Sequence, residues 1–367
     1  MSLSQSSPGI SDLKRARLLR IKEALDRVPD SGMITILPDY FVDRFVRIDD
    51  FDKLAAEINQ KGDEGGGGSI RGIRQSEVKG GNAVNMAYAL GSLRANTRLI
   101  TIANSLPAEM LKSTFKGLPS VSLDIIEGDP GFTVAFEFRR NERLVNVMVS
   151  DAGTLKDFDD TNLKEGHWRD ISQSGLVCLV NWSAIKRATE LTEKVFTYAL
   201  EKGVETFFDP ADVSEKSEDL AGLKRQVIDK GLIKYFSMND NEARIISRIL
   251  VGHTLSQEYS KEDLVKTIKI LNDLTGERVD IHTHRFSMTC FEKEVTVADC
   301  HKLVQKTITG GGDVWDAADL LGYRTGLKDE DRLCLANGAA GLFVSKEDAV
   351  PPAGSEILEF LQNNFVG

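Results

Sequence analysis

The chain has 367 residues, of which 41% are hydrophobic and 28% charged, a composition typical of a globular protein with one large α/β domain or two smaller ones. Its 46 Lys and Arg residues are outnumbered by 56 Asp and Glu, and the formal charge of −10 argues against binding of nucleic acid or of an anionic membrane. Because no apolar run reaches the ~18 residues of a membrane span and no signal-peptide core is present, we expect a cytoplasmic protein. The 4 cysteines show no C-x-x-C pairing, which favours free thiols over a disulfide framework or zinc site.

The N-terminal region begins with a predicted helix. Apolar residues in 11–28 recur at helical spacing, and this helix belongs to an N-terminal extension over residues 1–32. Further on, the stretch 61–72 contains the four consecutive glycines Gly65–Gly68, which predict a loop without regular structure. Neither the extension nor the loop has an assigned role.

Three segments predict a small accessory sheet or lid. The stretch 33–48 begins as a strand despite Pro38, and β-rich runs follow at 69–78 and 132–149. The last run contains Asn141-Glu142, a predicted hairpin turn between alternating strands.

From about residue 170 the pattern becomes regular. Short apolar strands alternate with segments of helical length, which predicts a doubly wound, mostly parallel sheet with helices on both faces in a domain over residues 33–367. Ligands bind such sheets outside the carboxyl ends of the strands. The predicted strands are 175–182, 204–210, 233–239 and 278–284, and the polar residues at their ends are Asn181, Asp209, Asp212, Asn239, His282 and Thr283.

Three glycines precede a predicted helix near the C-terminus. Within KTITGGGDVWDAADLL the glycines Gly310–Gly312 lead into a helix whose first turn carries Asp313. Glycine lets the backbone approach a ligand, and the free N–H groups of a helix N-terminus attract anions. A carboxylate beside bound phosphates suits a base that takes a proton from an attacking hydroxyl. A plain turn with Asp313 as its N-cap explains the motif equally well.

A second junction lies in VKGGNAVN. Gly80 and Gly81 end an extended segment, Asn82 can cap the following helix, and Asn85 lies one turn in, where its amide can meet a polyhydroxy substrate. A tight strand–helix junction with an Asn cap is an equally good reading in isolation.

The third junction lies in SMNDNEAR. Asn239 and Glu242 are three residues apart and can face one pocket, with Glu242 orienting a hydrated Mg²⁺. For this pair alone a capping box is the commoner explanation.

The order of the three motifs is more specific than any one of them. G-G-x-x-x-N in the first third, N-x-x-E past the middle and G-x-G-D near the end resemble the ribokinase-like (phosphofructokinase-B type) carbohydrate kinases. The resemblance covers roughly 33–365 and includes Asp43 and the helix predicted at 332–345. It implies an enzyme that moves the terminal phosphoryl group of a nucleotide to a hydroxyl of a small sugar-like acceptor.

The resemblance also implies roles for individual residues. Strands near 69–78 and 132–149 would form a lid that excludes water from the acceptor. Asp313 would be the catalytic base, with an anion hole at Gly310, Gly311 and Gly312. Asp43, Gly80, Gly81 and Asn85 would bind the acceptor, Asn239 and Glu242 (through water) would manage Mg²⁺, and Asn337 would lie near the adenine.

One segment departs from the family pattern. His282-Thr283-His284-Arg285 replaces the usual Thr-x-Gly-x-x-Gly strand end, and it resembles the ADP-dependent branch of the superfamily. Thr283 and Arg285 are therefore candidate nucleotide ligands, although a surface position for Arg285 is the simpler interpretation. ATP is the favoured donor, and ADP remains an open alternative.

Several alternatives stay open and others are excluded. A sugar, sugar phosphate, sugar acid or nucleoside all suit the acceptor pocket, and a homodimer formed through the lid is an open possibility. A catalytically inactive binding protein would not need Asp313. A dinucleotide-binding oxidoreductase is excluded because residues 33–48 contain no glycine, and a P-loop enzyme because G-x-x-x-x-G-K-[ST] is absent.

Overall fold

Within the residues that the computed structural model describes, 10–141, 143–306 and 309–364, nine strands form the main sheet. Seven of them pair in parallel, and β12 and β13 add an antiparallel edge. The central strands β1 and β8 are buried along their whole length, as continuous apolar runs between two helical layers should be. In spatial order the strands are β13 (Glu294–Asp299), β12 (Phe286–Phe291), β11 (Arg278–His282), β10 (Tyr235–Asn239), β9 (Glu205–Asp209), β8 (Leu176–Val180), β1 (Ile34–Leu37), β4 (Thr97–Ile102) and β5 (Val121–Ile126).

The strand order reverses beside β1. The chain leaves β1, later builds β4 and β5 on one side, and then returns to the other side of β1 with β8, β9 and β10. The carboxyl ends of β1 and β8 therefore border the crevice at which doubly wound sheets bind ligands.

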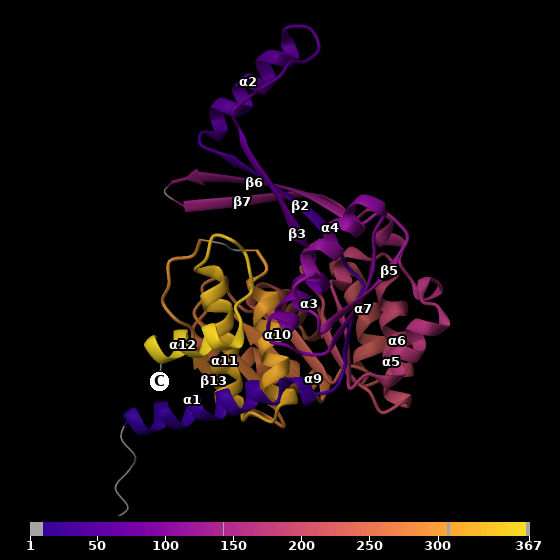
Figure 1. Ribbon diagram of the computed structural model, residues 1–367, viewed down its shortest axis with the longest axis vertical. Coiled ribbons are helices and arrows are strands. Elements are labelled where there is room, and N and C mark those ends of the chain that lie inside the picture. The colour runs from indigo at the N-terminus through magenta and orange to yellow at the C-terminus, as the bar shows by residue number, and fades with distance from the viewer. Residues whose placement is uncertain (1–9, 142, 307–308, 365–367) are drawn as a thin grey trace, which may run out of the picture.

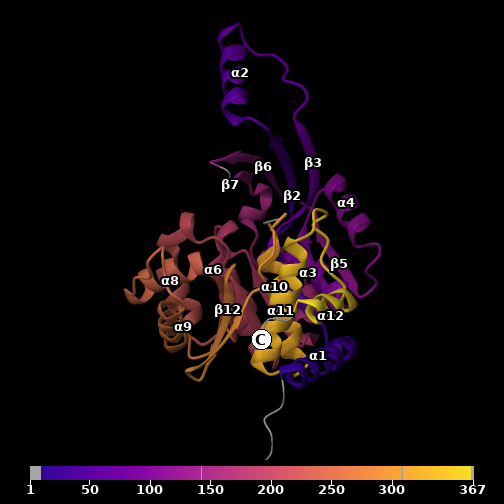
Figure 2. The same ribbon diagram turned by 90° about the vertical axis from the view of Figure 1, so that its left-hand side faces the viewer.

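Helices cover both faces of the main sheet, each over its own hydrophobic core (Figure 2). The prediction of a doubly wound α/β fold is thereby confirmed. One layer comprises α5 (Glu165–Gln173), α6 (Ala188–Glu201), α7 (Leu220–Leu223), α8 (Asp240–Val251) and α9 (Lys261–Thr275). The other comprises α1 (Ile10–Asp26), α3 (Asn82–Ser92), α4 (Ser105–Phe115), α10 (Gly311–Arg324), α11 (Asp329–Val344) and α12 (Gly354–Asn363).

A second, four-stranded sheet lies above the main one (Figure 1). Its order is β3-β2-β6-β7, and β2 pairs in parallel with β6 while the other pairs are antiparallel. The strands are β2 (Phe41–Ile48), β3 (Arg74–Gly80), β6 (Gly131–Arg140) and β7 (Arg143–Asp151).

Two details of this region differ from the sequence interpretation. The stretch 33–48 is not one accessory segment, because β1 lies in the main sheet and only β2 joins the second sheet. The helix α2 (Phe51–Asp63), which the sequence interpretation missed, extends into the segment expected to lack regular structure. Its Phe51 ring stacks on Phe138 of the second sheet at 4.5 Å. Of the hairpin turn predicted at Asn141-Glu142, Glu142 lies outside the described residues.

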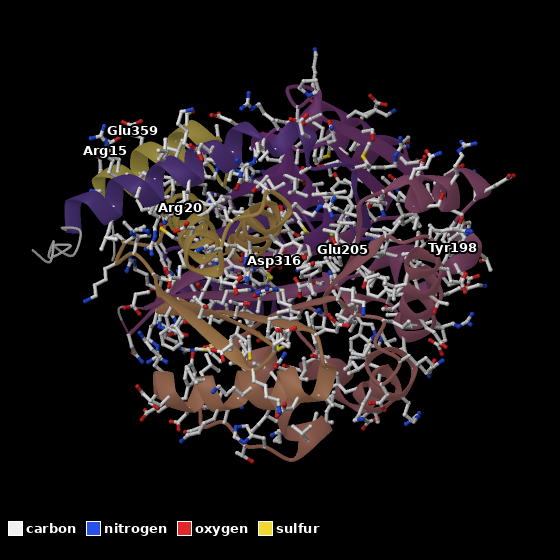
Figure 3. The ribbon with its side chains drawn as sticks, turned by 90° about the horizontal axis from the view of Figure 1, so that it is seen from below. Arg15, Arg20, Tyr198, Glu205, Asp316 and Glu359 are labelled. Carbon is white, nitrogen blue, oxygen red and sulfur yellow. The ribbon has the colours of Figure 1, made fainter. Side chains whose placement is uncertain are left out.

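The N-terminal helix α1 packs along the end of the molecule opposite the second sheet (Figure 1). Its Ile21 and Leu25 join the core shared with α11 and α12, and Arg17 and Arg20 both bond Asp331. Figure 3 shows Arg15 on this edge of the molecule beside Glu359 of α12, with Arg20 further in. Among the helices of the described residues, none has both the length and the apolarity needed to cross a membrane. The four cysteines are free thiols.

Candidate active site

The N-terminus of α10 lies at the carboxyl edge of the main sheet. Gly310 precedes the helix with a φ of 87°, in the left-handed region that glycine adopts without strain. A Cβ on Gly312 would come within 3.0 Å of the His282 ring, which would have to shift by a few tenths of an ångström to admit it. The first amides of the helix have no intrahelical acceptor, which makes this turn an anion site.

Asp313 is buried at this turn and is hydrogen-bonded to the second motif. The Asn85 amide donates from Nδ2 to Asp313 Oδ2 at 3.0 Å, although the two residues are 228 positions apart in the chain. Lys79 donates from Nζ to Asn85 Oδ1 at 2.8 Å. Lys79, Asn85 and Asp313 thus form one chain of contacts from β3 through α3 to α10.

Asp43 of β2 pairs with Val78 of β3, and its side chain lies against Gly80 and faces the same region. A Cβ at Gly80 would come within 2.1 Å of Asp43 Oδ2, so glycine at this position makes room for the carboxyl group. Thr133 of β6, the register partner of Asp43, hydrogen-bonds that group, but burial outweighs this bond and raises the pKa of Asp43 to about 6.

A cavity of about 470 Å³ brings most of the predicted site residues together. The main sheet supplies its floor, α10 one wall, and the second sheet contributes Thr133, Met148 and Ser150. The predicted residues that line it are Asp43, Gly81, Asn85, Asn239, Glu242, Gly310, Gly312 and Asp313.

Carboxyl groups dominate the electrostatics of this cavity. Burial raises the pKa of Asp313 to about 8, and the charges of Asp209 and Asp39 add to the rise while Asn85 and Lys79 oppose it. Burial also raises the pKa of Asp39 to about 6, although its carboxyl accepts from the Asn82 and Ala83 amides at 2.8 Å. A base with a pKa near neutrality is suited to proton abstraction.

Asn239 and Glu242 form a reciprocal cap at the start of α8. The Asn239 side-chain oxygen accepts from the backbone N–H of Glu242 at 2.9 Å, and the Glu242 carboxylate accepts from the backbone N–H of Asn239 at 2.7 Å. Glu242 still borders the cavity, and burial followed by the charge of Asp209 raises its pKa well above the usual range. No cluster of three or more acidic, His or Cys ligands occurs among the described residues. One carboxylate beside phosphates fits a hydrated Mg²⁺ rather than an all-protein cage.

Three residues expected on the nucleotide side are engaged elsewhere. Thr283 and Arg285 do not line the cavity of Asp313. The Thr283 hydroxyl donates to the Phe286 carbonyl in the β11–β12 turn, and the exposed Arg285 guanidinium stacks on the Tyr259 ring at 4.6 Å. Asn337 is buried and donates from its side-chain nitrogen to the Ala298 and Asp299 carbonyls of β13, while its oxygen accepts from Trp315. Their roles in nucleotide binding stay predictions.

Sequence reasoning did not single out Lys79, Asp39 or Asn82 as site residues. Asp39 follows β1 and ties the α3 N-terminus to Asn181 at the end of β8, through a 2.8 Å bond from the Asn181 amide. Asn82 donates to Asp209 at 3.3 Å and lines the cavity. The position of Asp39 after a buried strand was a usable signal, whereas Lys79 resembles any strand-end lysine until the pairing of β2 and β3 is known.

Comparisons with known proteins agree with this geometry. The sequence profile of a family described as prokaryotic ketohexokinase matches residues 39–364. No curated protein matches the chain in sequence. Similar solved structures include the ribokinase of Thermotoga maritima, which is 17% identical with a TM-score of 0.68 over 90% of this chain and 100% of that one.

Two further structures share the fold at similarly low identity. The ribokinase of Arabidopsis thaliana complexed with ribose and ATP is 16% identical, with a TM-score of 0.66 over 90% of this chain and 98% of that one. A phosphofructokinase-2 variant from Escherichia coli is 12% identical, with a TM-score of 0.66 over 90% and 98% of the two chains. Because the family profile spans most of the sequence, the chain belongs to the prokaryotic ketohexokinase family and is a carbohydrate kinase of the ribokinase fold, a nucleotide-dependent sugar phosphotransferase.

Proposed function

We propose that this protein transfers the terminal phosphoryl group of ATP to a hydroxyl of a ketohexose, with Asp313 as the catalytic base. The observation that carries the proposal is the position of Asp313. It lies at a glycine-lined helix N-terminus, where an anion is attracted, and is bonded to Asn85 on the side from which the acceptor would approach. The family supports a ketohexose as the acceptor.

The proton and the phosphoryl group are handled by neighbouring parts of α10. Asp313 takes the proton from the acceptor hydroxyl as its oxygen attacks phosphorus, while the amides that follow Gly310 stabilise the charge on the transferring group. Asp43 and Asn85 hold other hydroxyls of the sugar, so that the attacking oxygen lies near Asp313.

ATP and Mg²⁺ would occupy the side of the cavity next to β10 and α8. Mg²⁺, when bound, neutralises charge on the phosphates. Glu242 and Asn239 would hold it through water, since both line the cavity and offer oxygen atoms. The solved relative complexed with ribose and ATP supports ATP as the donor.

The second sheet would act as the lid. Its Thr133, Met148 and Ser150 border the same cavity as Asp313 from the opposite side. Closure of this sheet over the sugar would exclude water, which otherwise competes with the acceptor for the phosphoryl group.

A coupled assay that crosses acceptors with donors tests the proposal. The acceptors are ketohexoses, aldohexoses, a sugar phosphate, a sugar acid and a nucleoside, and the donors are ATP, GTP and ADP. We expect the highest kcat/KM for a ketohexose with ATP. Preference for another acceptor class would contradict the substrate. Preference for ADP, together with a raised nucleotide KM in Arg285→Ala, would contradict the donor.

A further inference from the structure

Lys79 stands out because it brings a positive charge to a site dominated by carboxyl groups. It is the residue of β3 directly before Gly80 and Gly81. Burial lowers its pKa, and the charges of Asp313 and Asp43 oppose that shift. Its Nζ atom lies 4.8 Å from the Tyr88 ring centre. The side chain lines a second cavity, of about 960 Å³, which shares Asp43 and Asn85 with the first.

We propose that Lys79 is a positioning residue for phosphoryl transfer, which orients the Asn85 amide and keeps Asp313 ionised as the base. This inference rests on the proposed role of Asp313. It assigns to Lys79 no contact with the reacting atoms, because its bond to the site runs through Asn85.

The orientation argument follows from donor and acceptor counts. An Asn side chain has one acceptor oxygen and one donor nitrogen, and an ammonium group has donors alone. Lys79 therefore fixes the oxygen of Asn85 on its own side, and the nitrogen must face Asp313. Without the ammonium group the amide is free to flip, and the flipped form turns an oxygen toward the Asp313 carboxylate.

The charge argument follows from the groups that face Asp313. Asp209 at the end of β9 and Asp39 after β1 oppose its ionisation, and Asp316 on its own helix is a further carboxyl neighbour. The Asn85 hydrogen bond and then the charge of Lys79 lower the pKa of Asp313 against them. Burial lowers the pKa of Lys79 itself to about 8, so the ammonium form predominates below that pH and its effect on Asp313 fades as pH rises through it.

The sign of the expected pH effect is fixed. Catalysis needs Asp313 deprotonated, so kcat/KM rises with pH through the pKa of Asp313. Removal of the positive charge raises this pKa further. The acid limb of the profile then moves to higher pH, and activity lost at neutral pH is recovered in part at alkaline pH.

The experiment compares Lys79→Met, Lys79→Gln and Lys79→Arg with wild type and with Lys112→Met, which changes an exposed lysine on α4. The readouts are kcat and KM for the acceptor across a pH series, with thermal unfolding as a check on folding. We expect the acid limb of the kcat/KM profile to move upward by about one pH unit or more in Lys79→Met and Lys79→Gln, and to stay in place in Lys79→Arg and in Lys112→Met. The side chain introduced by Lys79→Gln can still donate to Asn85, so kcat at high pH should be higher in Lys79→Gln than in Lys79→Met.

The results separate this inference from the proposed function. An uncharged Lys79 variant with lower activity but an unmoved acid limb would overturn the inference. A structural defect alone lowers activity without moving the acid limb. If Lys79→Met does not fold, the Gln variant decides on the same criterion. High residual activity in Asp313→Asn would instead overturn the base itself, whatever the Lys79 variants do.

Discussion

The helix α10 carries two groups of buried charge that are balanced in opposite ways. Near its N-terminus Asp313 and Asp316 face Asp209, and Lys79 is the cation that acts on Asp313. Two turns further on, Asp319 contacts Arg332, which is fully buried. The Arg332 guanidinium also donates to Asp280 at 3.1 Å and to Asp329 at 3.3 Å.

The difference indicates that the part of α10 near Asp319 stabilises the fold, whereas the part near Asp313 does not. Around Arg332 the guanidinium spreads its donors over three carboxyl groups from α10, α11 and β11, so the charges fix how these elements meet. Around Asp313 the carboxyl groups repel one another, which costs stability and yields a basic, proton-accepting group at neutral pH. Asp316 lies in the interior of the molecule (Figure 3).

Replacement of the base should have the largest effect. Asp313→Asn removes the proton acceptor and keeps the side-chain shape, so we expect kcat to fall by about 10²- to 10⁴-fold with little change in the nucleotide KM. Steady-state kinetics with the preferred acceptor measure it. A kcat near that of wild type would show that another group takes the proton.

Loss of the buried cation Arg332 should lower the stability of the protein. Arg332→Met takes the paired cation from Asp280 and Asp319, while Asp329 keeps its ion pair with Arg278. We expect a loss of about 3–5 kcal/mol in the free energy of unfolding. Urea unfolding measures this loss, with the exposed Arg248→Met as the matched control. Addition of Asp280→Asn and Asp319→Asn should restore part of it. Equal stability of the two Met variants would mean that the buried network contributes little.

A change on the acceptor side should affect substrate binding more than turnover of the nucleotide. Asn85→Ala and Asp43→Ala each remove a partner for sugar hydroxyls, and we expect the acceptor KM to rise by an amount equivalent to ~1–3 kcal/mol. Background hydrolysis of the nucleotide should persist. If both activities fall together, these residues support the fold rather than the acceptor.

The smallest effect should be the change in stability when Asp316, a buried carboxyl group near Asp313, is replaced by a neutral residue. Burial, followed by the charge of Asp209, raises the pKa of Asp316 well above its value in the unfolded chain. The folded protein therefore holds an extra proton in this range, and stability falls as pH rises through it. The neutral side chain of Asp316→Asn does not titrate, so this variant does not lose stability in that way. The free energy of unfolding of the variant minus that of wild type should therefore rise by roughly 1 kcal/mol from acid to alkaline pH. Urea unfolding at several pH values measures it, and a pH-independent difference would contradict the argument.

The sequence predicted the fold because its main signals are local. Apolar runs such as 175–182 and 204–210 gave the parallel strands, and the glycines before Asp313 gave the helix N-terminus. The split of 33–48 between two sheets was not predictable, since both halves read as extended chain and only tertiary pairing separates them.

The site was predictable where a motif carried it and not where long-range contacts did. Asn85 and Asp313 stood in recognisable motifs, but their hydrogen bond depends on the packing of α3 against α10. Lys79 interacts with Asp43 and Asp313, and Asp39 with Asn181, all of which are remote in sequence. The engagement of Asn337 with Trp315 and β13 is likewise a product of packing, which residue type alone does not reveal.

The projecting helix α2 has a consequence for how this enzyme can vary. The antiparallel pairing of β2 and β3 ends at Arg47 and Arg74, so the 26 residues between them (48–73) form an excursion from a hairpin whose stem already bears Asp43 and Lys79. No side chain of α2 is fully buried. Ile48, Phe51, Leu54 and Ile73 contact the small core of the second sheet. Away from these four residues, insertions, deletions and drift in the excursion leave the register of the stem untouched, so natural variation can accumulate there.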